Sequence, residues 1–179
     1  MSFFKLCGLL CVLFCCAGIG VYSARRLSLR VESLEALASL FRQLESLVLY
    51  TAEPLGKLFS HMEKEFPNLP FLRECRLLIE GKISFPTAFS AAIRQTAFEM
   101  GLRREDIELL CQPGSQLGKT DLKGQQSLYQ LLELRVSERL SLAREDAEKK
   151  GKIYRSVGLL GGVALVLFEM CIRDRRNDL

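Results

Sequence analysis

Few residues of this chain could carry out catalysis. Its single histidine, His61, lies near Glu63 and Glu65 in a stretch of helical pattern. In such a stretch, a solvated histidine on the helix surface is more common than a histidine that acts as a general base. The motifs GxxxxGK[ST], GxSxG, HExxH and GxGxxG, which bind phosphates or assemble hydrolytic sites, do not occur. We therefore expect no catalytic, cofactor-binding or metal-binding residues, and a protein that is not an enzyme.

The cysteines do not form a pattern typical of a disulfide framework or a zinc site. No CxxC pair occurs, and four of the seven lie inside the first apolar run. Their positions are Cys7, Cys11, Cys15, Cys16, Cys75, Cys111 and Cys171. We expect them to act as small buried apolar side chains.

The first part of the middle region, residues 25–156, is patterned as helices only. An apolar stripe runs through residues 27–50 in steps of three and four, which predicts a helix. Its members are Leu27, Val31, Leu34, Leu37, Phe41, Leu44 and Val48. Breaks at Pro54, at residues 66–70, at Gly81 and at Gly101 then predict three short helices. The last of these is expected to carry Phe85, Phe89, Ile93 and Phe98, and no segment alternates with the period of a strand.

A further apolar turn at residues 107–111 is expected to be interrupted at residues 112–115, which include Pro113. The run LGKTDLKGQQ at residues 117–126 then indicates a glycine turn followed by a helix cap. The residues predicted to form this cap and turn are Leu117, Gly118, Thr120, Asp121 and Gln125.

A long final helix follows, with an apolar stripe at Leu128, Leu132, Val136, Leu140, Ala143 and Ala147. The two long terminal helices should pack antiparallel, with the shorter helices closing the far end. The expected fold is therefore an all-α helical bundle whose terminal helices continue into N- and C-terminal membrane segments.

Two apolar segments predict these membrane anchors. Residues 6–22 carry no charge and as a helix span about 25 Å, against a hydrocarbon core of about 30 Å. A cleaved signal peptide is disfavoured because bulky Tyr22 stands three residues before the candidate cleavage point. Residues 157–168 reach only about 18 Å before Glu169 ends the run. A buried core helix is the alternative for this second segment.

The predicted organisation is an anchor at residues 1–24, a helical domain at 25–156, a shortened membrane segment at 157–169 and a polar tail at 170–179. The string MCIRDR at 170–175 resembles a translated sequencing adapter, so we expect the tail not to be native.

Basic residues flank both apolar segments on the side of the middle region, and Arg30 adds to them. They are Arg25, Arg26, Lys149, Lys150, Lys152 and Arg155. This asymmetry predicts a cytoplasmic domain, with the basic residues meeting membrane lipids. The formal net charge of +4 gives no nucleic-acid signature, and nothing indicates a small-molecule substrate.

The run LGKTDLKGQQ, preceded by YTAEPL at residues 50–55 and framed by two apolar segments, resembles the stage III sporulation protein AB family as far as residue 168. One departure is Pro113, where an aromatic or aliphatic residue is expected. The resemblance implies a component of a secretion-like apparatus between mother cell and forespore, in the mother-cell membrane around the forespore.

The same resemblance implies a domain similar to the cytoplasmic helical domain of type II secretion and type IV pilus platform proteins. It also implies work beside a secretion-type ATPase of the same operon and other stage III sporulation membrane proteins. We expect the membrane-distal helices to meet that ATPase through exposed charge. The candidate contacts are Lys57, Lys64, Arg73, Arg76, Lys82, Glu63, Glu65, Glu74 and Glu80.

Two other hypotheses stay open. The domain could serve a membrane-anchored adaptor or sensor that binds a soluble regulator. A pocket that gathers carboxylates from several helices would instead indicate an enzyme.

Overall fold

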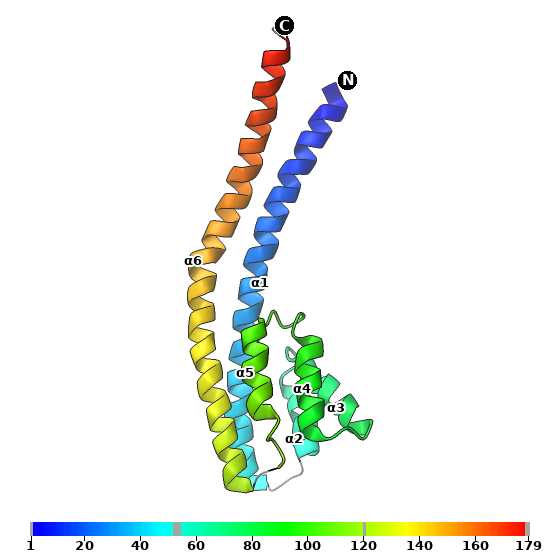
Figure 1. Ribbon diagram of the computed structural model, residues 1–179, viewed down its shortest axis with the longest axis vertical. Helices are drawn as coiled ribbons and strands as arrows, with labels where there is room; N and C mark the ends of the chain where they lie inside the picture. Colours follow the sequence, from blue (N-terminus) through cyan, green and yellow to red (C-terminus); the bar gives the residue numbers. More distant parts are fainter. Residues whose placement is uncertain (1, 52–54, 120, 178–179) are drawn as a thin grey trace. The chain divides into compact units, whose positions relative to one another are not determined.

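The computed structural model describes the backbone of residues 2–51, 55–119 and 121–177, and side chains for 15, 18–48, 50, 56–119, 121, 123–154, 156–157 and 160. Within these residues all regular structure is helical (Figure 1). The helices are α1 (Ser2–Thr51), α2 (Leu55–Glu65), α3 (Pro70–Glu80), α4 (Phe85–Thr96), α5 (Arg104–Gly114) and α6 (Leu122–Asn177). The predicted all-α class is confirmed.

The chain divides into two compact units. One is Leu29–Arg144, and the other combines Met1–Ser28 with Glu145–Leu179. Among the residues that are described, no helix is both long enough and apolar enough to cross a membrane. The predicted segments at 6–22 and 157–168 lie mostly on residues whose side chains are outside the description. The two membrane segments therefore stay predictions.

Within the unit Leu29–Arg144, α1 and α6 run antiparallel. Arg144 of α6 donates to Glu35 of α1 at 2.6 Å, and Gln130 of α6 donates to Glu45 of α1 at 2.6 Å. Higher numbers on α1 thus meet lower numbers on α6. The buried rings of Phe41 and Tyr129 also stack between the two helices, with centroids 6.5 Å apart.

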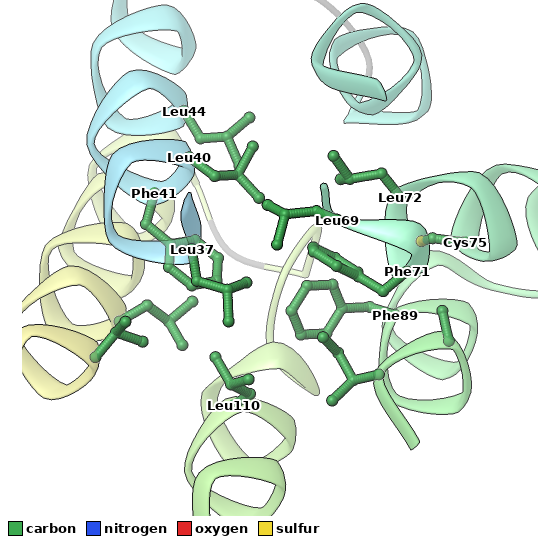
Figure 2. Packing of buried hydrophobic residues seen from close by; sticks show 14 of the residues in the cluster. Leu37, Leu40, Phe41, Leu44, Leu69, Phe71, Leu72, Cys75, Phe89 and Leu110 are labelled. Atoms are coloured by element: carbon green, nitrogen blue, oxygen red, sulfur yellow. The ribbon is translucent and has the colours of Figure 1, made fainter. Parts of the chain in front are cut away.

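The predicted α1 stripe is buried in this unit. Leu34, Leu37, Phe41 and Leu44 are at most 1% exposed, because their spacing of three and four places them on one helix face. Figure 2 shows Leu37, Leu40 and Leu44 of this helix facing apolar side chains of the short helices, such as Phe71 and Phe89. The α1 residues therefore anchor α2 to α5 through apolar burial, the main favourable term in folding.

Four phenylalanines from three short helices complete the core. Phe89 of α4 packs edge-to-face against Phe59 of α2 and Phe71 of α3, with centroids 6.2 and 5.7 Å apart. Phe85 adds an edge-to-face contact with Phe59 at 4.8 Å. Edge-to-face contacts of this kind fix orientation as well as burying area.

One local prediction was wrong. The fourth helix does not continue to Gly101 but ends at Thr96, and Phe98 in the following turn is 69% exposed. The chain reverses there because Gly101 adopts φ 68°, where glycine has no steric penalty. The interruption predicted at residues 112–115 is confirmed, because the helix ends within this range, although Pro113 itself does not break it. Helix α5 includes Pro113 and ends at Gly114, where Ser115 N–H donates to Cys111 O at 3.1 Å.

The hydroxyl of Tyr129 is buried and has no hydrogen-bond partner among the side chains and backbone described. Burial also raises the pKa of this phenol, which stays protonated. We expect Tyr129→Phe to leave the fold intact and raise the free energy of unfolding by about 1 kcal/mol, because it removes an unpaired buried polar group. Denaturant melts would measure it. A loss of stability would mean that the hydroxyl is bonded in solution.

Candidate protein-binding surface

The predicted contact residues on α2 and α3 divide into paired and unpaired charges. Arg76 of α3 donates to Glu63 of α2 at 2.7 Å and to Glu80 at 2.8 Å. Glu65 accepts a hydrogen bond from Gln43 of α1 at 3.1 Å. These four side chains hold the short helices to one another and to α1, so the structure gives them an internal role.

The other five candidates have no ion pair or side-chain hydrogen bond among the described residues. They are Lys57, Lys64, Arg73, Lys82 and Glu74. The four cations are exposed, whereas Glu74 is half-buried. At 100° per residue, Glu74 lies about 160° around α3 from Arg76, which faces α2. The charge left available beside α2 is therefore positive.

The environment of Glu63 shows how closely these cations gather. The hydrogen bond from Arg76, followed by the charges of Arg76, Arg73 and Lys64, holds the pKa of the Glu63 carboxyl below its ordinary value against the opposing effect of burial. One carboxylate thus faces three cations, and only Arg76 is bonded to it. Arg73 and Lys64 remain free to attract a further negative charge.

The most buried polar contact lies elsewhere, between α1 and α5. Arg30 Nε and Nη2 donate to the two carboxylate oxygens of Asp106, each at 2.8 Å, and the side chains are 3% and 1% exposed. Asp106 also accepts from Arg103 N–H at 2.9 Å, closing the first turn of α5. Glu105 beside it pairs with Arg139 of α6 at 2.9 Å. Consecutive acids therefore tie α5 to both long helices.

This pair corrects the use of Arg30 as a membrane-flanking charge. Its side chain is committed to Asp106, so it does not contribute to the basic surface around the predicted membrane segments. The sequence did contain a signal, since Arg30 stands three residues after Leu27 and four before Leu34 on the apolar stripe. A charge at such a position indicates a buried partner.

The turn before α6 contains the predicted cap residues. Leu117 is fully buried, and Gly118 has φ 78°, a conformation that favours glycine. Asp121 Oδ1 accepts the N–H of Gly124 at 3.0 Å, and Gln125 N–H donates to Asp121 O at 2.9 Å. Thr120 lies outside the described residues. The geometry is that of a helix N-cap with a structural purpose.

We expect Asp121→Ala to lower the free energy of unfolding by about 1 kcal/mol, because the Gly124 N–H loses its acceptor. Thermal melts would measure it, with Lys123→Ala, an exposed neighbour, as the matched control. Unchanged melting together with lost function would assign Asp121 to a partner instead.

The predicted membrane-flanking residues are partly compensated. Lys149 pairs with Glu145 and Lys150 with Asp146, each one helical turn away on α6. Arg25 and Lys152 are exposed and Arg26 is half-buried, while the Arg155 side chain lies outside the description. The structure thus reduces the charge that this region can offer to lipid.

Two cysteines of the middle region behave as predicted. Cys75 and Cys111 are buried, and burial raises the pKa of the Cys75 thiol to about 12. Desolvation raises the pKa of Cys111 as well. Both are protonated, unreactive thiols at neutral pH. Within the described residues no three His, Cys, Asp or Glu side chains come together as a metal site would require.

Comparison with known proteins identifies the class. The stage III sporulation protein AB family matches residues 5–168, most of the chain. The chain therefore belongs to this family, as the LGKTDLKGQQ resemblance predicted. Stage III sporulation protein AB of Bacillus subtilis (strain 168) is 24% identical over 169 residues, covering 93% of this chain and 99% of the relative. No solved structure matches the chain.

Proposed function

We propose that this protein is a non-enzymatic platform in the mother-cell membrane around the forespore, where it links a cytoplasmic secretion-type ATPase to other stage III sporulation membrane proteins. Family membership supports the sporulation role. The mechanical role rests on what the family resemblance implies, a likeness to the cytoplasmic domains of type II secretion and type IV pilus platform proteins.

The observation that carries the proposal is the antiparallel pairing of α1 and α6. Glu35 meets Arg144, and Glu45 meets Gln130, so both long helices leave the unit Leu29–Arg144 at the same end. Anchors on the outer parts of these helices, as the sequence predicts, would enter one membrane from one side. The short helices would then be presented to the cytoplasm.

A platform also has to transmit force, and the contacts of α5 suit this task. The Arg30–Asp106 pair joins α5 to α1, and the Glu105–Arg139 pair joins it to α6. Phe89 connects α4 to α2 and α3 through its ring contacts. A load applied to the short helices would therefore reach both long helices through close-packed contacts.

Co-purification tests the proposal. The full chain carrying an affinity tag should recover the ATPase of its operon and stage III membrane proteins from sporulating cells in mild detergent. Recovery of a soluble regulator without either of these would favour the adaptor or sensor alternative.

A further inference from the structure

The charged side chains that α2 exposes without a bonded partner among the described residues are positive. Leu58, Phe59 and Met62 turn into the core, at most 4% exposed. The acids Glu63 and Glu65 are bonded to Arg76 of α3 and Gln43 of α1. Lys57 and Lys64, seven residues apart, lie on one exposed face of the helix. Among the described residues neither lysine is bonded to a carboxylate, so free cations lie on this face.

Helix α3 extends the same surface. A Cβ placed on Gly56 would lie 3.8 Å from Ile79, and Glu63 bonds Arg76, so α2 and α3 run antiparallel. Arg73 thus lies near Lys64, which agrees with their joint effect on Glu63. At the other end of the helix pair, Lys82 follows the end of α3 at Glu80, and Lys57 lies in the first turn of α2. Four exposed cations line the two helices.

An exposed apolar side chain accompanies these cations. Leu77 is 44% exposed and stands one helical turn after Arg73 on α3. Cations around an accessible apolar side chain suit a protein contact, in which charge guides association and apolar contact adds affinity. Gln43, which bonds Glu65, lies about 20 Å along α1 from Arg30, so the surface is far from the end at which both long helices leave the unit.

We propose that this basic surface, formed by Lys57, Lys64, Arg73, Lys82 and Leu77, binds an acidic segment of a partner protein. Under the proposed function, on which this assignment of the partner rests, that segment belongs to the ATPase. The ion pairs within the protein determine which charge the partner should carry. Glu63 and Glu80 are bonded to Arg76, so the cations of this surface remain available to bind a negatively charged partner.

A fluorescent poly-glutamate peptide tests the chemistry without reference to function. The full chain in non-ionic detergent should bind it, measured by fluorescence anisotropy. Lys64→Glu/Arg73→Glu should weaken binding roughly tenfold, because two attractions become repulsions, and the difference should shrink at high salt. The matched control Lys119→Glu/Lys123→Glu makes the same change in net charge at exposed residues of the α5–α6 turn and the start of α6, and should bind like the wild type.

Three results would overturn the proposal. One is equal peptide binding by both double variants. Another is that Lys64→Gln/Arg73→Gln, which avoids repulsion with Glu63, binds like the wild type. The third is that Lys64→Glu/Arg73→Glu keeps the peptide but loses phosphatidylglycerol vesicles, because the surface would then contact a membrane.

The failure of this inference is distinguishable from failure of the proposed function. If Lys64→Glu/Arg73→Glu co-purifies with the ATPase as well as the wild type does, the platform stands and the basic surface is not its contact. If the wild type recovers no ATPase but binds the peptide in the predicted pattern, the basic surface stands and the assigned partner is wrong.

Discussion

Replacing Asp106 by alanine is expected to lower the free energy of unfolding by about 3 to 5 kcal/mol. Its carboxylate receives two N–H groups of Arg30, a side chain only 3% exposed, and one backbone N–H from Arg103. The substitution removes the negative charge that offsets a buried guanidinium. Because the pair joins α5 to α1, melting of the full chain in detergent should report the loss directly.

An exposed ion pair supplies the control for Asp106→Ala. Arg42 bonds Glu133 at 2.6 Å between α1 and α6, but Arg42 is 70% exposed, so Arg42→Ala should cost less than about 1 kcal/mol. The apolar pair Arg30→Met/Asp106→Leu should recover much of the stability, because neither charge is then buried. Equal losses for Asp106→Ala and Arg42→Ala would show that the Arg30–Asp106 pair is not buried in solution.

Gly114→Ala should lower the free energy of unfolding by about 1 to 3 kcal/mol. A Cβ at this position would lie 2.5 Å from Cδ1 and Cε1 of Phe89. The Phe89 ring is fully buried and contacts Phe59, Phe71 and Phe85, so displacing it disturbs these packed rings. The sign is informative, since glycine to alanine inside a helix otherwise stabilises by about 1 kcal/mol.

Gly56→Ala on α2 is the matched control for this substitution. A Cβ there meets only Ile79, at an ordinary 3.8 Å, so stability should hold or rise slightly. Phe89→Leu should make room for the new methyl group, so Gly114→Ala should cost less in that background than in the wild type. Equal costs in the two backgrounds would mean that Phe89 is not the residue displaced.

The core residues were predicted from helical periodicity, and the prediction is confirmed where burial depends on a single helix face. Leu34, Leu37, Phe41 and Leu44 follow directly from the helical repeat, as do Leu132 and Val136 on α6. Phe98 was expected on the fourth helix, but α4 ends at Thr96 and leaves Phe98 in an exposed turn. The position of an apolar residue near a helix end is thus harder to predict from sequence than that of a residue inside an apolar stripe.

The candidate surface was predictable only in part. Exposed charge between residues 57 and 82 could be read from helix patterning. The pairing of Arg76 with Glu63 and Glu80 could not, because it depends on how α2 and α3 cross. The Arg30–Asp106 pair joins residues 76 positions apart, and local patterning cannot identify such a partner.

Site-specific photo-crosslinking in sporulating cells would test the central claim most directly. A photoreactive residue at Leu77, on the proposed basic surface, should capture the ATPase of the operon. The same residue at Leu142 on α6, a leucine that is slightly more accessible at 52% exposed, should not capture it. Capture of a soluble regulator at Leu77, or of the ATPase only from positions 149–155, would contradict the account of a platform that meets its ATPase through the short helices.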